Sequence, residues 1–362
     1  MSSGYPGERL VTYSHHPHSQ HHARTHGHHH HGHDPSHFEQ AARARWEELT
    51  GASDRLGWFE TLAVKLSAAQ ATHTPQTQPR SLLIFAADHG FTASAASDDT
   101  PYDTRQTLRQ LVQESSAVRV LSRLYGVNLR VFDVGISTPG GAIPGVLHQP
   151  VRPGTRDFTQ EAALTIAEVK QAMKVGADAA GKALEHGDRL LILNGFGQGS
   201  ATSAAALAAW VLEYSVPDSN DRGQGRESIE SDMIQAALKH HRNAIRNPVS
   251  LLACLGGLET AALAGAILQA TAHHLPVWLG GLSAVTAAAV AARIDPHVTG
   301  ALFASGLPDT PYAAQLLNQL NLDPLPRVGS HMDEAAKALL TLPLLDAAAA
   351  LFNGMKPAHT AV

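Results

Sequence analysis

The sequence predicts an α/β protein whose parallel sheet carries helices on both faces, in a Rossmann-like arrangement. Short apolar runs alternate with longer segments of helical periodicity along most of the 362 residues. The apolar runs are continuous, which is typical of strands buried on both faces of a parallel sheet. Each run is followed by glycine, aspartate, asparagine or serine. These residues are typical of the loops at the carboxyl edge of such a sheet, where ligands bind.

The predicted strands are short, and helices connect them. We expect strands at residues 81–87, 129–134, 190–193, 276–279 and 302–304. We expect helices at residues 38–71, 104–125, 160–185, 203–212, 232–244, 248–272, 283–293, 312–320 and 333–352. A proline-broken linker is expected at 72–80 and a polar surface loop at 216–230. Strands that alternate with helices in this way imply crossover connections, and therefore a parallel sheet.

Composition excludes several classes of function. The formal net charge is −5 and lysine and arginine form no cluster, which argues against a nucleic-acid partner. Cys254 is the only cysteine, so no intrachain disulfide can form and the chain fits a reducing compartment. No signal-peptide core is evident, and no apolar run approaches the roughly 18 residues of a membrane span. We therefore expect a soluble cytoplasmic protein without membrane contact.

Residues 1–37 form a low-complexity tail that holds 12 of the 23 histidines. A segment this polar cannot bury enough apolar surface to fold alone. Neutral imidazole binds Zn²⁺, Ni²⁺, Co²⁺ and Cu²⁺, so the tail is a candidate for loose binding of a divalent transition metal. The candidate ligands are His28, His29, His30, His31 and His33. The alternative is a disordered extension, or part of an expression tag, without a defined metal site.

The segment NGFGQGSAT, residues 194–202, is the strongest functional motif in the chain. It follows an apolar strand and opens an alanine-rich helix. Glycines let the backbone approach an anion, and a helix N-terminus adds unpaired N–H groups and the positive end of its dipole. The spacing matches neither G-x-G-x-x-G nor the Walker pattern. The motif indicates a phosphate-binding loop; the alternative is a glycine-rich turn that binds nothing.

Acidic residues and a histidine follow the predicted strands. Asp88, His89 and Asp133 come after the first two strands, and Asp333 and Glu334 open the last helix. Carboxylates in these places are candidates for acid–base chemistry. Each has a structural alternative, because carboxylates also cap helices, bond turn amides and complement the helix dipole.

The order of several motifs resembles the nicotinate-nucleotide:dimethylbenzimidazole phosphoribosyltransferase family, which assembles the lower ligand of cobalamin. The motifs are FAADHG (85–90), FDVGI (132–136), GTRDF (154–158), LGGLETAALAGAIL (255–268) and LPLLDAAAA (342–350). The resemblance implies a phosphoribosyltransferase-like domain at 38–355, with a large α/β part at about 81–305. It also implies a small helical part built from 38–71 and 311–353, and a homodimer.

The family's reaction transfers phosphoribose from nicotinate mononucleotide to 5,6-dimethylbenzimidazole or a related base and requires no cofactor. By this resemblance Glu334 falls on the general base. The family's phosphate loop, G-E-M-G-I-G-N-T-T, falls on residues 194–202, which include Gly197, Gly199, Ser200 and Thr202. The loop that lines the base pocket is matched by Ser97, Thr104 and Gln106. Asp88 and His89 are further expected substrate-binding residues.

Several ligand-facing positions depart from the family pattern. The usual L-G-E-G-S-G keeps its glutamate, but its last glycine is Lys337 here. Gly195 stands where the family's phosphate loop has an acidic residue. Gly280 stands where the family's L-D-G-F segment has its aspartate, so that carboxylate is lost as well. A His-Arg-Ser-Ala-Glu segment is replaced by residues 306–310. Two alternatives therefore stay open: a non-catalytic or regulatory paralogue on the same fold, and a metal-handling protein that works through its histidine tail.

Overall fold

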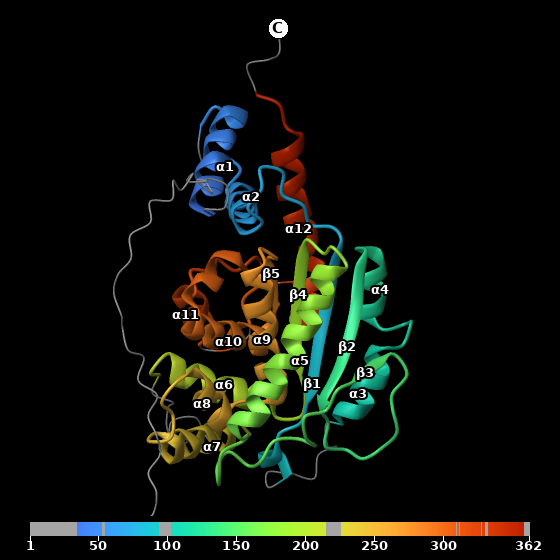
Figure 1. Cartoon of the computed structure of the whole chain (residues 1–362), viewed down its shortest axis with the longest axis vertical. Coiled ribbons are helices and arrows are strands. Elements are labelled where there is room, and N and C mark those ends of the chain that lie inside the picture. The colour runs from blue at the N-terminus through green and yellow to red at the C-terminus, as the bar shows by residue number, and fades with distance from the viewer. Residues whose placement is uncertain are drawn as a thin grey trace, which may run out of the picture. The chain divides into compact units, whose positions relative to one another are not determined.

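A six-stranded sheet with all neighbouring strands parallel forms the centre of the protein. The computed structural model describes residues 35–52, 55–93, 103–214, 226–308, 310, 312–326, 328–329 and 332–357. The strands are β1 (Arg80–Ala87), β2 (Val127–Gly135), β3 (Val146–His148), β4 (Leu190–Phe196), β5 (Val277–Gly280) and β6 (Leu302–Ala304). Their order is β3-β2-β1-β4-β5-β6 (Figure 1). The predicted fold class is confirmed.

Helices follow or precede nearly every strand. The first half of the chain has α1 (Pro35–Thr50), α2 (Trp58–Ala69), a 3₁₀ turn (Gly90–Ala93), α3 (Thr104–Leu111), α4 (Ala117–Leu124) and α5 (Ile166–Glu185). The middle has α6 (Ser200–Val211), α7 (Arg226–His241), α8 (Pro248–Leu255) and α9 (Leu258–Ala272). The last part has α10 (Gly281–Ile294), a 3₁₀ turn (Pro296–Ala301), α11 (Ala313–Gln319) and α12 (Glu334–Gly354).

The two faces of the sheet bury separate apolar cores. On β1, Leu83, Phe85 and Ala87 pack into a core shared with α5 to α11. The alternate residues Leu82 and Ile84 pack into a core shared with α2, α3, α4 and α12. This alternation follows from the period of two in a strand, and it explains why every β1 residue is buried. The apolar runs of the sequence therefore encode a sheet covered on both faces.

Several predicted helices are broken where local capping favours a new start. Residues 104–125 form two helices because Ser116 caps α4 by accepting a hydrogen bond from the Arg119 N–H. Residues 248–272 are interrupted at Gly256–Gly257. α5 begins only at Ile166, because Thr165 and Glu168 form a capping box. The strand β3 was not predicted, since its three residues give no recognisable period.

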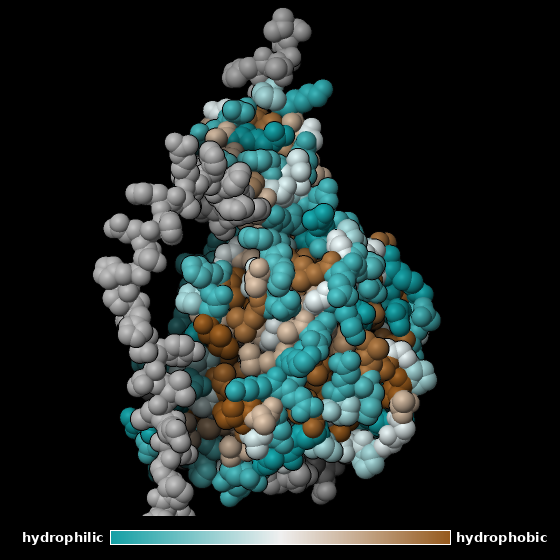
Figure 2. Space-filling view, in the orientation of Figure 1, coloured by the Kyte–Doolittle hydropathy of each residue, from teal (hydrophilic) through white to brown (hydrophobic). Residues whose placement is uncertain are grey.

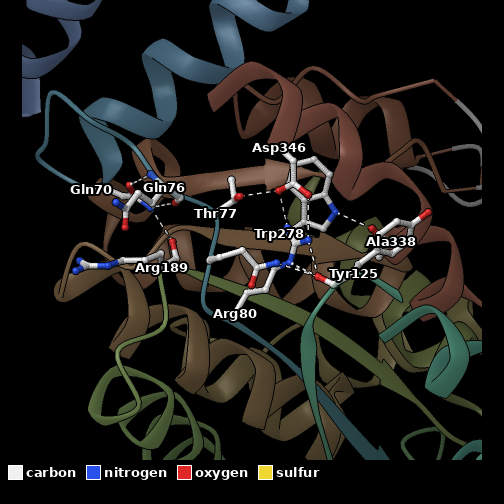
Figure 3. Close-up of polar contacts among 10 residues, drawn as sticks. Gln70, Gln76, Thr77, Arg80, Tyr125, Arg189, Trp278, Ala338 and Asp346 are labelled. Atoms are coloured by element: carbon white, nitrogen blue, oxygen red, sulfur yellow. Dashed lines mark hydrogen bonds and ion pairs between the residues drawn. The ribbon is translucent and has the colours of Figure 1, made fainter. Parts of the chain in front are cut away.

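α12 runs along the sheet from its carboxyl edge to its amino edge. Near its start the Ala338 carbonyl accepts a hydrogen bond from Nε1 of Trp278 on β5, at 3.0 Å. Further along, Asp346 forms a bidentate ion pair with Arg80, the first residue of β1, at 2.7 and 3.0 Å (Figure 3). These two contacts place the first residue of α12, Glu334, at the carboxyl edge.

The far end of α12 packs with α1 and α2 in a small third core that includes Trp46, Ala63 and Phe352. α1, α2 and α12 come from the two ends of the described chain, where a small helical part was expected. α11 instead packs into the large core, through Leu316 and Leu317. Helix α1 starts at Pro35, so the end of the tail that we predicted at residue 37 lies inside this helix.

α5 shows the amphipathic pattern of a helix that covers a sheet. Its outer face carries Lys170, Lys174 and Asp178, and forms a diagonal hydrophilic band in Figure 2. α12 has a different character. Within the described part of the chain it is the one helix long and apolar enough to cross a membrane, yet 56% of its apolar window is buried in the protein.

Candidate active site

The chain order reverses between β1 and β4, which lie side by side at the centre of the sheet. In open parallel sheets this switch point leaves a crevice at the carboxyl ends of the two strands, and ligands bind there. β1 leads there into Asp88 and His89, and β4 leads into the glycine-rich loop. The residues predicted from strand ends are therefore brought to one place.

Asp88 ties several segments of this edge together. Its Oδ2 accepts hydrogen bonds from the backbone N–H and the hydroxyl of Ser137, at 2.7 and 2.8 Å. Its Oδ1 accepts one from the Thr104 hydroxyl and one from the Gln198 N–H, the latter at 3.3 Å. The residue is buried. Because the protein itself engages both oxygens, Asp88 shapes the site through the loops that it holds.

The loop after β4 has a backbone that only glycine permits at two positions. A Cβ on Gly197 would lie 1.6 Å from the Ala87 carbonyl oxygen, so the loop passes directly over the end of β1. Gly199 has φ +87°, in the left-handed region, and it is the N-cap of α6. Because Gly199 offers no side-chain cap, N–H groups of the first turn of α6 stay available for an anion.

Ser200 and Thr202 lie in the first turn of α6, and both are buried. Their hydroxyls can supplement backbone N–H groups as phosphate donors. Ser203, one position further, donates its hydroxyl to the Leu255 carbonyl at 2.7 Å, which anchors the helix to the end of α8. The first turn of α6 is thus held in place by packing, as a preformed anion site requires.

The His89 and Glu259 side chains form a buried polar contact next to this loop. Nε2 of His89 lies 3.1 Å from Oε1 of Glu259, and neither side chain is exposed. The His89 backbone N–H donates to the Gln198 carbonyl at 3.0 Å. Among the described residues, Nδ1 of His89 and Oε2 of Glu259 have no hydrogen-bond partner. The imidazole that we expected to contact substrate points into the protein, and the backbone of His89 holds the loop.

Glu334 begins α12 beside the end of β5. Asp333 caps the helix by accepting hydrogen bonds from the Ala335 and Ala336 N–H groups, at 2.8 and 3.2 Å. The Glu334 side chain packs against Gly281, where a Cβ would lie 2.9 Å from that of Glu334. It is 42% exposed, and its Oε1 accepts a hydrogen bond from Nζ of Lys337 at 2.8 Å.

The ends of β4 and β5 are joined by a side chain, so the glycine-rich loop after β4 lies next to the end of β5, which Glu334 of α12 contacts. Nδ2 of Asn194 donates to the Gly280 carbonyl at 2.8 Å. Asn194 is the first residue of the predicted phosphate loop, and Gly280 directly precedes the glycine that Glu334 contacts. The edge formed by β1, β4 and β5 therefore offers anion donors at one end and a carboxylate at the other.

An arginine–glutamate pair fixes the loop that supports the end of β1. The Arg156 guanidinium donates to both oxygens of Glu168, at 2.8 and 3.1 Å. These hydrogen bonds lower the pKa of Glu168 to about 2. The adjacent Thr155 N–H donates to the Asp88 carbonyl at 2.9 Å. The GTRDF motif thus joins the site to the N-terminus of α5.

The remaining predicted residues are exposed or lie outside the described part of the chain. Gln106 is exposed on α3. Ser97 and the histidines His28, His29, His30, His31 and His33 lie outside the described residues. Within the described residues no cluster of three or more His, Cys, Asp or Glu side chains could hold a metal ion. A cavity of about 340 Å³ lies beside Arg156 and Cys254. None of the residues expected to bind the phosphate or to accept the proton lines it.

Sequence reasoning missed three polar partners in the site. Glu259 lies within the LGGLETAALAGAIL motif but is 170 positions from His89, and Ser137 is 49 positions from Asp88. Such pairs give no local signal. Lys337 departs from the family pattern, and its spacing of three from Glu334 is the spacing of neighbours on a helix.

Comparisons with known proteins show which family the chain resembles. Residues 33–362 match a family model described as Phosphoribosyltransferase. A protein of Bradyrhizobium diazoefficiens named nicotinate-nucleotide–dimethylbenzimidazole phosphoribosyltransferase is 34% identical over 319 residues, which is 87% of this chain and 91% of that protein. A Salinispora tropica protein of the same name is 34% identical over 316 residues, covering 82% of this chain and 87% of that protein.

The fold is shared as well. A crystal structure of nicotinate-nucleotide–dimethylbenzimidazole phosphoribosyltransferase from Thermus thermophilus superimposes with a TM-score of 0.80 at 30% identity, covering 89% of this chain and 96% of that one. Sequence and structure thus agree over nearly the whole described chain. This chain belongs to the nicotinate-nucleotide–dimethylbenzimidazole phosphoribosyltransferase family.

Proposed function

We propose that the protein transfers phosphoribose from nicotinate mononucleotide to 5,6-dimethylbenzimidazole or a related base, as a step of cobalamin nucleotide-loop assembly. A ring nitrogen of the acceptor forms a bond to the anomeric carbon of the ribose. The bond from that carbon to the nicotinate nitrogen breaks, and nicotinate leaves with the electron pair. The products are α-ribazole 5′-phosphate and nicotinate. Membership of the family and the names of its relatives support this reaction.

The assignment of residues to this reaction rests on one observation. The glycine-rich loop and Glu334 lie at the ends of the neighbouring strands β4 and β5, which the hydrogen bond from Asn194 to Gly280 joins. The nucleotide substrate needs an anion site and, within reach of it, a group that accepts a proton. Gly197, Gly199 and the first turn of α6 provide donors for the 5′-phosphate. Ser200 and Thr202 add hydroxyls.

Glu334 is the general base of this proposal. The attacking azole carries an N–H proton that must leave as the new C–N bond forms, and a carboxylate can accept it. The ribose gains oxocarbenium character in the transition state, which nearby negative charge stabilises. Asp88 and His89 act as positioning residues, because both hold the loop at Gln198.

The proposal extends to assembly, location and metals. By family analogy the protein works as a homodimer in the cytoplasm and needs no cofactor. The histidine tail binds a divalent transition metal loosely, apart from the reaction. These points are independent of the chemistry at Glu334.

A nicotinate-release assay tests the function. Wild-type protein mixed with nicotinate mononucleotide and 5,6-dimethylbenzimidazole should release nicotinate, and Glu334→Gln should abolish the release. Glu47→Gln, an exposed glutamate on α1, is the matched control and should keep full activity. Thermal unfolding and nucleotide binding of Glu334→Gln should match the wild type.

The absence of carboxylates at Gly195 and Gly280 favours a second candidate, a non-catalytic paralogue that binds ligands on the same fold. The same assay separates the two. Folded wild-type protein that binds nicotinate mononucleotide but releases no nicotinate with a panel of benzimidazoles and phenols would exclude the enzyme and support the paralogue.

A further inference from the structure

Lys65 is a half-buried lysine on α2 that has no role in the proposed reaction. Its Nζ lies 5.3 Å from the centroid of the Phe303 ring on β6. Among the described residues no group accepts a hydrogen bond from this ammonium or forms an ion pair with it. An ammonium carries three N–H donors, and away from water it needs acceptors for them. The charged form of Lys65 is therefore held only weakly by its surroundings.

The Lys65 side chain lines a small cavity of about 60 Å³ between α2, β6 and the segment that follows α11. Most of the lining is apolar and comes from Trp58, Leu62, Leu302, Phe303, Leu322 and Leu325. Trp58 is 52% exposed, so this wall of the cavity reaches the surface of the protein. The amine thus lies beside a space that a small molecule can enter from solvent, and the space admits a short chain rather than a bulky ring.

Burial controls the protonation of this amine. It lowers the pKa of Lys65 from its usual 10.5 to about 8, because the charged form loses its hydration. Two carboxylates oppose this change and raise the pKa: Asp323, which also lines the cavity, and Glu39 on α1. With such a pKa about a quarter of the amine is neutral at pH 7.5, against about one part in a thousand for an ordinary lysine. The neutral amine is the nucleophilic form.

We propose that Lys65 is a modification site whose amine is acylated by small activated acyl groups, such as acyl phosphates and acyl thioesters. The amine nitrogen attacks the carbonyl carbon and forms a C–N bond. The bond from that carbon to the phosphate oxygen or the thioester sulfur breaks, and the phosphate or thiolate leaves with the electron pair. The surplus proton on the nitrogen passes to water. The product amide is neutral, so the cation over Phe303 and its attraction to Asp323 are both lost.

The experiment exposes the native protein briefly to acetyl phosphate, or to the neutral acetyl thioester N,S-diacetylcysteamine. Peptide mass spectrometry then measures the acetylated fraction at each lysine, with Lys170, an exposed lysine on α5, as the internal reference. At pH 7.5 Lys65 should react roughly five to twenty times faster than Lys170, since the gain in neutral amine outweighs its lower basicity and partial burial. Between pH 8 and 10 the rate at Lys65 should level off while the rate at Lys170 keeps rising. In concentrated urea the two rates should become equal.

Asp323→Asn tests whether the charges of the cavity control the amine. The change removes a group that raises the pKa of Lys65, so acetylation of Lys65 at pH 7 should become about two to three times faster. Asp178→Asn, which removes an exposed carboxylate on α5, is the matched control and should leave the rate at Lys65 unchanged. Lys65→Arg should remove the fast-reacting site altogether.

A preference for Lys65 over Lys170 with either donor supports the inference, and the comparison of the two donors shows which one reaches the cavity. Equal or slower acetylation of Lys65 with both donors would overturn it. A preference that persists in urea would overturn it too, because the local sequence rather than the folded cavity would then be the cause. The same holds for a rate at Lys65 that rises in parallel with Lys170 up to pH 10, or that does not change in Asp323→Asn. None of these outcomes depends on the phosphoribosyl transfer.

Discussion

Arg80 and Asp346 are 266 positions apart and form a bidentate ion pair at the amino edge of the sheet (Figure 3). The Arg80 side chain is almost fully buried, and its remaining donors reach the Tyr125 carbonyl. Thr77 also donates to Asp346, at 2.6 Å. This pair joins β1 to α12, the helix whose first residue is Glu334. The aspartate of the LPLLDAAAA motif is therefore structural, and from the opposite edge it helps to position α12, which begins with Glu334, the proposed general base.

Asp346→Asn should lower the free energy of unfolding by about 2–4 kcal/mol, because it leaves a buried guanidinium without its counter-charge. Urea unfolding followed by circular dichroism measures the change. Asp178→Asn is the control: it breaks an exposed pair on α5 and should cost under about 1 kcal/mol. Equal, small effects in the two variants would show that Arg80 does not depend on Asp346.

Because of the ion pair between Arg156 and Glu168, the free energy of unfolding should depend on pH in the acidic range. The folded state lowers the pKa of Glu168 from its usual 4.5 to about 2, chiefly through hydrogen bonds from Arg156. Its stabilisation is therefore complete above about pH 4.5 and is lost as the pH falls towards 2. Glu168→Gln should cost about 2–3 kcal/mol at pH 7 and progressively less between pH 4.5 and 3.

Urea unfolding at several pH values measures this dependence. Glu161→Gln is the control, since Glu161 is exposed and its nearest oxygen lies 3.9 Å from Arg156. It should change little at any pH. A cost of Glu168→Gln that stayed constant from pH 7 to 3 would contradict the assigned cause.

Much of the fold could be predicted because its signals are local. The buried strands appear as apolar runs, since both faces of the sheet are covered. The breaks in the helices were missed, because Ser116 and Gly256 lie in segments whose apolar pattern continues on both sides. β3 was missed because three residues at the edge of a sheet depend on their partner β2 rather than on their own sequence.

The site was predictable only in part, for a related physical reason. The glycine-rich loop and Asp88 could be found, because strand ends in a parallel sheet converge whatever the rest of the chain does. The direction in which each side chain points could not be predicted. His89 points to Glu259 because α9 begins where it does, and a neighbour on another element has no signature near residue 89. Lys337 could have been paired with Glu334 from helical spacing alone.

Asp88→Asn should disturb the site without removing a group that contacts substrate. The amide would present an N–H group where Asp88 now accepts from Ser137, Thr104 and Gln198. We expect a loss of about 1–3 kcal/mol in stability and a raised KM for nicotinate mononucleotide, because the loop after β4 loosens. Calorimetry and the nicotinate-release assay check both values. Normal stability with a raised KM would instead indicate that Asp88 contacts the substrate directly.

Deleting residues 1–33 should separate metal binding from the reaction. The cut removes His28 to His33 and leaves α1, which begins at Pro35, complete. Titration with Zn²⁺ or Ni²⁺ should show metal binding in the full chain and its loss in the shortened one, while nicotinate release stays unchanged. Adding a chelator to the full chain should likewise leave turnover unaffected. A shortened protein that keeps its metal, or loses its activity, would contradict this division.

Thr202→Val tests the location of the phosphate. Valine has the shape of threonine without the hydroxyl, and Thr202 is buried in the first turn of α6. If its hydroxyl donates to the 5′-phosphate, the substitution should weaken binding of nicotinate mononucleotide by about 1–3 kcal/mol, the cost of leaving a charged partner short of a hydrogen bond. Thr286→Val on α10 is the control, because that buried hydroxyl has no partner among the described residues. Calorimetric affinities that are equal in the two variants would mean that the phosphate binds elsewhere on the loop.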